Sequence, residues 1–172
     1  MIGLAHRIIS VEDLLLNPFN LIGKDWMLIS SGSKDSFNMM TAGWGGLGIL
    51  WGKKVIFCFI RPTRYTYKFV NENDLFTVSF FSSEYREALN ICGRYSGRDV
   101  DKVKLSGLIP VEDDEYRPVY YDQARLVFIC KKIYYQDINP DNFLDESIHN
   151  NYPMKDYHRM FVGEIVKALE KR

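Results

Sequence analysis

The order of strand-type and helix-type segments limits this chain to a few architectures. Stretches rich in β-branched and aromatic residues predict strands at 26–30, 37–44, 54–60, 75–81, 125–135 and 157–169. Helical patterns between them are short, and several strands have none after them. A doubly wound parallel sheet requires regular alternation of strands and helices, which this chain lacks. The pattern therefore predicts an all-β fold with short peripheral helices, of the small barrel or sandwich type.

Short helices are expected in some of the gaps between these strands. Thr63, Ser82 and Asp99 are polar residues suited to capping, and each stands before a helical pattern; the last helix ends near Gly107. The Gly-Gly-Leu-Gly stretch at 45–48 fits no regular element, and we expect it to be a loose connection.

Bulk composition excludes several classes of protein. The chain has 172 residues, 47% hydrophobic and 26% charged, which predicts one domain over residues 1–172. Its formal net charge is zero, so we expect no nucleic-acid partner. It also has no signal-peptide pattern and no apolar run long enough to span a bilayer, so we expect no membrane partner. Three cysteines without CxxC spacing favour a reduced, cytoplasmic protein with no metal site.

The first segment with chemical potential is Asn38-Met39-Met40-Thr41-Ala42-Gly43-Trp44. In a strand, Asn38, Met40, Ala42 and Trp44 share one face. Hydrogen-bonding groups beside an apolar surface suit the faces and edge of a flat heterocycle such as an isoalloxazine ring. An amphipathic strand with a buried tryptophan explains the same spacing equally well.

The second segment is Arg61-Pro62-Thr63-Arg64-Tyr65-Thr66, where a predicted strand passes into a predicted helix. The start of a helix offers free N–H groups and partial positive charge, which attract anions. Arg64 adds a forked donor that matches a phosphate group. A capped helix with solvent-exposed arginines is the alternative, and it is the commoner meaning of such a stretch alone.

The third segment is Ser96-Gly97-Arg98-Asp99-Val100-Asp101-Lys102. Gly97 allows backbone N–H groups to approach an anion closely, and Lys102 follows about one turn later. A solvated cluster of balanced charges is the alternative. Taken together, the three segments fit a phosphorylated aromatic cofactor better than a metal site or a hydrolase triad.

These segments resemble the flavin reductase-like, FMN-binding split-barrel proteins, and most closely their flavoredoxin branch. The matching stretches follow the family's order at 38–46, 61–66, 89–93, 96–102 and 157–165. The resemblance implies a six-stranded antiparallel split β-barrel. It also implies a homodimer, with FMN near the subunit interface.

The resemblance also implies a set of cofactor-binding residues. Beside the flavin ring it places Asn38, Met39, Thr41, Ala42 and Trp44. Along the ring edge and phosphate it places Arg61, Arg64, Tyr65 and Thr66. At the phosphate and ribityl chain it places Ser96, Gly97, Arg98 and Lys102, and His158 approaches from the last strand. It identifies no catalytic acid or base.

One departure from the family bears on the electron donor. Relatives that use NAD(P)H often carry Gly-Asp-His before the last strand, where this chain has Asp156-Tyr157-His158. The sequence therefore favours an FMN-dependent oxidoreductase whose donor is NADH, NADPH or a partner protein. Two alternatives stay open: a flavoredoxin-type electron carrier without NAD(P)H activity, and a non-catalytic flavin-binding module. A hydrogen-bonded strand residue is the plain alternative for His158.

Overall fold

The computed structural model describes residues 5–172, and its main feature is one antiparallel sheet. Within these residues the sheet has eight strands: β1 (His6–Ile9), β2 (Met27–Ser33), β3 (Ser36–Ala42), β4 (Gly45–Leu50), β5 (Lys53–Ile60), β6 (Leu75–Phe80), β9 (Leu126–Asp137) and β10 (Arg159–Lys171). The strand order is β3-β2-β6-β9-β10-β5-β4, and β1 pairs with β10 outside this path. A separate hairpin joins β7 (Pro110–Glu112) to β8 (Val119–Tyr121).

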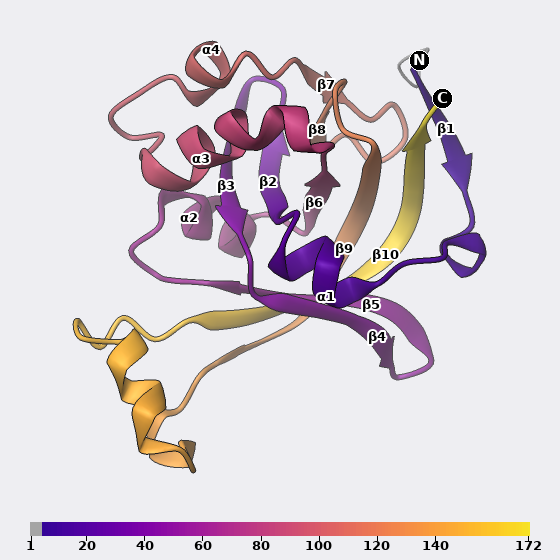
Figure 1. Ribbon diagram of the computed structural model, residues 1–172. Coiled ribbons are helices and arrows are strands. Elements are labelled where there is room, and N and C mark those ends of the chain that lie inside the picture. Colours follow the sequence, from indigo (N-terminus) through magenta and orange to yellow (C-terminus); the bar gives the residue numbers. More distant parts are fainter. Residues whose placement is uncertain (1–4) are drawn as a thin grey trace.

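The two ends of this path meet, which gives the sheet its barrel form. β3 and β4 are the outermost strands of the path, yet only Gly43 and Trp44 separate them along the chain. The sheet therefore curls until its edges lie at one place (Figure 1). The predicted antiparallel split-barrel class is confirmed, whereas the predicted number of six strands is wrong.

The expected loose connection at 45–48 is also wrong, because these residues belong to β4. Glycine weakens an isolated strand, so the sequence pattern favours a loop. In the folded chain β4 pairs with β5 along its whole length. A side chain at Gly45 would collide with the backbone carbonyl of Phe57, so close packing against β5 requires glycine there.

Alternating strand residues divide the core into two layers. Met27 and Ile29 of β2 face the barrel interior, together with Phe76, Val78 and Phe128 from β6 and β9. Residues of the opposite face pack into a second cluster, which α3 (Arg86–Arg94) and the β7–β8 hairpin cover. The other helices are α1 (Pro18–Gly23), α2 (Tyr65–Glu72) and α4 (Lys102–Ser106), with 3-10 turns η1 (Val11–Asp13), η2 (Ser83–Tyr85), η3 (Pro140–Asn142) and η4 (Glu146–Asn151). None of the helices within residues 5–172 is long and apolar enough to cross a bilayer.

The expected helices form, but all three predicted caps are displaced. Tyr85, not Ser82, is the N-cap of α3, and Ser82 stands before the 3-10 turn η2 without a capping hydrogen bond from its side chain. Arg64, not Thr63, is the N-cap of α2, and no side chain caps it. Asp101, not Asp99, caps α4, since its carboxylate accepts a hydrogen bond from the Lys104 amide. Asp99 closes a turn before the helix instead, because its N–H donates to the Ser96 carbonyl. Gly107 ends α4 with a left-handed backbone, as predicted.

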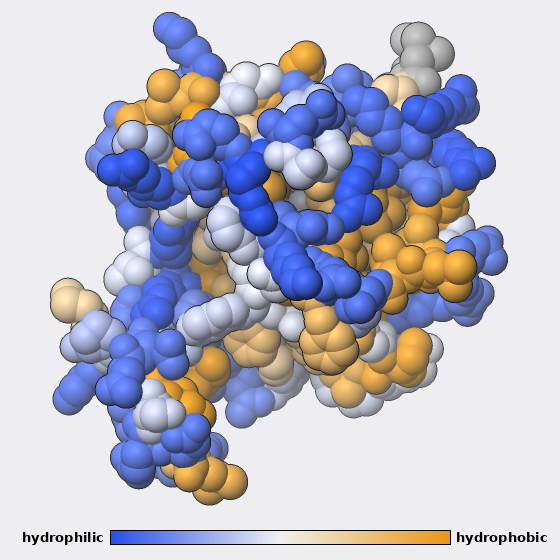
Figure 2. Space-filling model, in the orientation of Figure 1, coloured by the Kyte–Doolittle hydropathy of each residue, from blue (hydrophilic) through white to orange (hydrophobic). Residues whose placement is uncertain are grey.

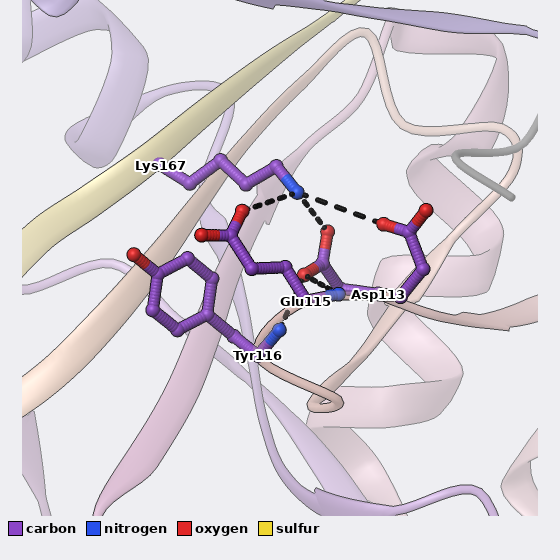
Figure 3. A network of polar contacts seen from close by, with 5 residues as sticks. Asp113, Glu115, Tyr116 and Lys167 are labelled. Atoms are coloured by element: carbon purple, nitrogen blue, oxygen red, sulfur yellow. Dashed lines mark hydrogen bonds and ion pairs between the residues drawn. The ribbon is translucent and has the colours of Figure 1, made fainter.

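A buried ion pair fixes the β7–β8 hairpin to the barrel (Figure 3). The Lys167 side chain on β10 is only 5% exposed, and its ammonium lies 2.8 Å from Asp113 and 3.3 Å from Glu115. The second oxygen of Asp113 accepts the backbone N–H groups of Glu115 and Tyr116. These bonds compensate for burying the charges, so the cluster holds the hairpin in place.

The connection between β9 and β10 forms an arm, residues 138–158, that projects from the barrel (Figure 1, lower left). The 3-10 turns η3 and η4 lie in it, and the ring of Phe143 stacks on Tyr152 at 6.0 Å between centroids. Tyr152 also contacts Tyr157, with centroids 5.0 Å apart. These three rings form a small aromatic cluster within the arm, beside the barrel.

Candidate functional site

Two adjoining cavities open where β3 ends and α2 begins, and they share Arg64. The Trp44 cavity has a volume of about 230 Å³ and is lined by Met40, Thr41, Ala42, Gly43, Trp44, Phe59, Arg61, Arg64 and His158. The Thr66 cavity has a volume of about 210 Å³ and is lined by Thr63, Arg64, Tyr65, Thr66, Arg94, Tyr95, Ser96, Arg98, Asp99 and Lys102. Because Arg64 lines both cavities, they adjoin at this residue, and the two together are termed the cleft.

The Trp44 cavity combines aromatic and apolar side chains with polar and cationic ones. Trp44 lies on the short link between β3 and β4 and is 49% exposed, and its ring is 5.1 Å from that of His158. Phe59 and Met40 add apolar surface from β5 and β3. The Thr41 hydroxyl donates to the Leu89 carbonyl at 2.6 Å, which links β3 to α3. A flat ring therefore finds both aromatic contact and a polar edge here.

His158 is buried and uncharged at neutral pH. Its Nδ1 is 2.8 Å from the Tyr152 hydroxyl, which comes from the arm. Burial, reinforced by the nearby Arg61 charge, lowers the pKa of His158 to about 4, although Asp156 opposes this shift. The imidazole in the cavity is therefore a neutral hydrogen-bonding group. The alternative role of His158, a hydrogen-bonded structural residue, agrees with the same contact.

Arg61 connects the cleft to the arm. One guanidinium nitrogen pairs with Asp156 at 2.8 Å, and another donates to the Asn151 carbonyl at 2.7 Å. The guanidinium also lies 4.9 Å from the ring centroid of Tyr152. Because Asp156 already compensates its charge, Arg61 acts first as an anchor for the arm.

Basic residues predominate in the lining of the Thr66 cavity, and two of them, Arg64 and Lys102, have no carboxylate partner among residues 5–172. Lys102 is only 4% exposed, and its ammonium donates to the carbonyls of Met39 at 2.7 Å and Cys92 at 2.9 Å. Arg64 donates to the Gly93 carbonyl at 2.8 Å. Among residues 5–172 neither cation forms an ion pair with a carboxylate. Carbonyl dipoles alone hold them in place.

The pKa values of both cations are lowered. Burial, followed by repulsion from Arg64, lowers the pKa of Lys102 to about 8. Burial also lowers the pKa of Arg64. An anion that enters the cavity would relieve both effects, since it supplies the opposite charge. The first-turn N–H groups of α2 add donors at the same place, because a helix start leaves them without intrahelical acceptors.

Close packing below the cavity fixes its floor. The Asn38 amide on β3 donates to the Thr66 hydroxyl on α2 at 2.8 Å. Gly97 lies so close to Asn38 that a side chain there would collide with the amide oxygen. Arg98 donates to the Thr63 carbonyl at 3.4 Å and lies over the Tyr65 ring. The 96–98 loop and the start of α2 are therefore tied to β3.

Comparison with known proteins assigns the family. The family model described as "Flavin reductase like domain" matches residues 20–172. This chain belongs to the flavin reductase-like family. No curated protein sequence matches the chain.

Solved structures of the flavin reductase-like fold agree with this assignment. The flavoredoxin of Desulfovibrio vulgaris (Miyazaki F) is 25% identical with a TM-score of 0.65, over 93% of this chain and 74% of that protein. A flavin reductase-like FMN-binding domain from Shewanella baltica OS155 has a TM-score of 0.70 at 16% identity, over 96% of this chain and 77% of that protein. Flavoredoxin from Methanosarcina acetivorans has a TM-score of 0.64 at 20% identity, over 94% of this chain and 74% of that protein.

Most of the residues predicted for the cofactor site lie around this one cleft of the flavin reductase-like chain. Lining it directly are Thr41, Ala42, Trp44, Arg61, Arg64, Tyr65, Thr66, Ser96, Arg98, Lys102 and His158. Asn38 and Gly97 do not line the cleft directly. Asn38 donates a hydrogen bond to Thr66, which does line it, and Gly97 packs against the Asn38 amide. Met39 differs: its side chain packs in the second core cluster, and only its carbonyl reaches the site, where it accepts from Lys102.

Three residues that line the cleft lie outside the three segments singled out for their chemistry: Phe59, Arg94 and Tyr95. Four more lie within those segments but were not among the predicted cofactor-binding residues: Met40, Gly43, Thr63 and Asp99. Phe59 alternates along β5 with the buried Cys58 and Ile60, so strand periodicity places it on the other face. Arg94 and Tyr95 lie at the end of α3, immediately before the third segment. The sequence signal that could have identified them as site residues was an aromatic residue next to a basic one.

Proposed function

We propose that this protein is an oxidoreductase that holds FMN non-covalently in the cleft and passes electrons through it, with NADH, NADPH or a partner protein as donor. The observation that carries the proposal is the junction at Arg64. On one side lies a cavity with aromatic walls, and on the other a pair of cations that form no ion pair within the described part of the chain. A phosphorylated flat heterocycle has a matching part for each side.

The Thr66 cavity supports the phosphate end. Arg64 offers a forked donor and Lys102 a second positive charge, while Tyr65 and Thr66 at the start of α2 line the same cavity. Arg98 lies at the rim over Tyr65. We expect these groups to bind the phosphate with little rearrangement, because carbonyl hydrogen bonds already fix Arg64 and Lys102.

The Trp44 cavity supports the ring end. When bound, FMN itself supplies the hydride and electron-transfer chemistry. Trp44 and Phe59 would contact the ring, and the neutral His158 and the Arg61 guanidinium would lie near its polar edge. A cationic or hydrogen-bonding group at that edge stabilises negative charge on a reduced ring. No side chain of the cleft is needed as an acid or base.

A flavoredoxin-type electron carrier is the second candidate, favoured by the surroundings of His158. Asp156 takes the place of the family's glycine, and its carboxylate is occupied by Arg61. Trp44 is half exposed at the mouth of the cleft, where a redox partner would approach. The 25% identity with a flavoredoxin points in the same direction. A non-catalytic flavin-binding module is the third outcome that the experiment below distinguishes.

We also propose a homodimer in a reducing compartment such as the cytoplasm. Hydrophobic residues gather on the surface near α1 and β4 (Figure 2). They line a groove of about 360 Å³, formed by Leu14, Leu16, Leu47, Ile49 and Ile165 among others. Ile49 is 70% exposed, and a second copy would bury it. All three cysteines are free thiols, which fits a reducing environment.

The test is an absorption spectrum of the protein as purified and after addition of FMN, followed by anaerobic NADH or NADPH. A flavin spectrum that bleaches promptly with either nucleotide supports the reductase. A flavin spectrum that bleaches only with dithionite or a reduced partner protein supports the carrier. Bound flavin that no reductant bleaches supports the binding module, and a protein that retains no flavin refutes the proposal.

A further inference from the structure

Tyr152, in the arm, lies directly behind one wall of the Trp44 cavity. The residue is 6% exposed, and its hydroxyl is 2.8 Å from Nδ1 of His158. Tyr152 was not among the residues predicted for the cofactor site, and it does not line the cavity itself. Any effect of this hydroxyl on the cavity therefore passes through His158, which does line it.

Contacts on several sides fix the position of the Tyr152 ring. Phe143 stacks on it with centroids 6.0 Å apart, and Tyr157 contacts it at 5.0 Å. The Arg61 guanidinium lies 4.9 Å from the ring centroid. The His158 ring meets Tyr152 edge-on, with centroids 5.5 Å apart and an angle of 77° between the planes. Because the ring is held in this way, its hydroxyl is aimed at one imidazole nitrogen.

The hydrogen bond between Tyr152 and His158 has a definite direction. Burial raises the pKa of Tyr152, and the Arg61 charge and a hydrogen bond with the His158 backbone oppose this rise. A hydrogen bond lowers the pKa of a phenol only when the phenol oxygen accepts it, so the backbone donor is the His158 N–H. The hydroxyl then has one proton to donate, and Nδ1 is its only acceptor among residues 5–172.

The second ring nitrogen of His158 is left for the cavity. A neutral imidazole carries one proton, so an Nδ1 that accepts from Tyr152 leaves this proton on Nε2. Nε2 pairs with no group in the described part of the chain but keeps contact with open space. Because His158 lines the Trp44 cavity, the Nε2–H group is free to donate to a molecule that enters it.

We infer that Tyr152 is a positioning residue: it holds His158 in the Nε2–H tautomer, so that a neutral hydrogen-bond donor faces the polar edge of the ring in the Trp44 cavity. The inference rests on the proposed function, because it takes that ring to be the flavin. A donor at this edge favours the reduced ring, which carries more negative charge than the oxidised ring. Tyr152 acts without contact with the ring, since it lies behind His158.

The first test locates the imidazole proton in the flavin-free protein. Long-range ¹H–¹⁵N correlation spectra at pH 7 distinguish the two tautomers, and His158→Gln identifies the His158 signals among those of the three histidines. We expect the proton on Nε2 in the parent. Tyr152→Phe keeps the ring and removes only the hydroxyl, so both tautomers should be populated.

Tyr157→Phe is the matched control. Tyr157 belongs to the same aromatic cluster, and its hydroxyl forms no hydrogen bond with any residue that the structure describes. This variant should keep the His158 proton on Nε2, as in the parent.

An acid titration followed in the same spectra gives the direction of the bond independently. A hydroxyl that donates to Nδ1 stabilises the neutral imidazole, so Tyr152→Phe should raise the pKa of His158 above its value of about 4. A hydroxyl that accepts from Nδ1–H would stabilise the charged imidazole instead, and its removal would lower this pKa.

The second test measures the midpoint potential of bound FMN in the three proteins. We expect Tyr152→Phe to weaken the binding of reduced FMN, relative to oxidised FMN, by about tenfold. For a two-electron couple this loss lowers the midpoint potential by ~30 mV. Tyr157→Phe should leave the potential unchanged.

A proton on Nδ1 in the parent overturns the inference, as does a fall in the His158 pKa in Tyr152→Phe. Equal midpoint potentials for the parent and Tyr152→Phe overturn it as well. Failure of the proposed function is recognised separately, because FMN then does not bind to the parent. The spectra of the flavin-free protein still decide in that case which nitrogen of His158 carries the proton.

Discussion

The Thr66 and Trp44 cavities meet at Arg64, yet the chain builds them in different ways. Around the Thr66 cavity, buried hydrogen bonds tie Lys102 to β3 and Asn38 to α2. Around the Trp44 cavity, one wall belongs to the arm, which Arg61 holds through a partly exposed ion pair with Asp156. The contrast suggests that the phosphate end is pre-organised for affinity, and that the ring end can adjust to electron donors and acceptors.

The largest effect is expected from removing both central cations of the Thr66 cavity. Arg64→Ala combined with Lys102→Ala should weaken FMN binding by at least ~100-fold, since each charged hydrogen bond contributes ~1.5–3 kcal/mol. Fluorescence quenching of FMN measures the affinity. Lys104→Ala is the control for loss of charge, and far-ultraviolet circular dichroism checks the fold. An unchanged FMN affinity would show that these cations do not bind the phosphate.

A smaller effect is expected at the ring end. Trp44→Ala should weaken FMN binding by about tenfold, because one aromatic contact contributes ~1 kcal/mol beyond its buried area. Trp51→Ala is the matched control: Trp51 is 64% exposed and lines neither cavity of the cleft. The same quenching titration measures both variants. Equal losses of FMN affinity in the two variants would show that Trp44 does not contact the flavin.

The pH dependence of FMN affinity sharpens the electrostatic side of the comparison. Lys102 carries its charge below its pKa of about 8 and loses it above. A bound phosphate favours the charged form, so FMN affinity should be level below pH 8 and fall several-fold as the pH rises further. Lys102→Met should remove this fall. A parent protein with level affinity from pH 7 to 9.5 would contradict the role given to Lys102.

The smallest effect on FMN is expected from loosening the arm. Asp156→Asn removes the ion pair with Arg61, so proteases should cleave residues 138–158 several-fold faster. FMN affinity should change by less than about twofold, because the Thr66 cavity stays intact. Glu146→Gln, at an exposed position of the same arm, is the control. A large loss of FMN affinity would mean that the arm and the phosphate end are not separable.

Local patterns in the sequence predicted the parts of the fold that depend on local chemistry. The β-branched and aromatic run at 54–60 lies within β5, and Gly107 ends its helix as expected. β4 was not predictable, because its glycines form a strand only when β5 lies against them. Local propensity does not contain that tertiary contact.

The candidate site was predictable as segments but not as side-chain roles. The three segments do converge on one cleft. However, Lys102 turns inward to backbone carbonyls, and the Met39 side chain enters the core. Strand alternation places Met39 opposite Asn38 and Met40, so periodicity alone indicated its orientation. The contribution of the arm depends on contacts between Arg61 and residues about 90 positions later, which no local pattern reveals.

The central claim is that one cleft binds a flat ring and its phosphate at the same time. The most direct measurement compares the affinities of the flavin-free protein for FMN and for riboflavin, which has the same ring and no phosphate. We expect both to bind, with FMN tighter by about 100-fold because of the cations at Arg64 and Lys102. Equal affinity for the two flavins, or binding of neither, would contradict the account.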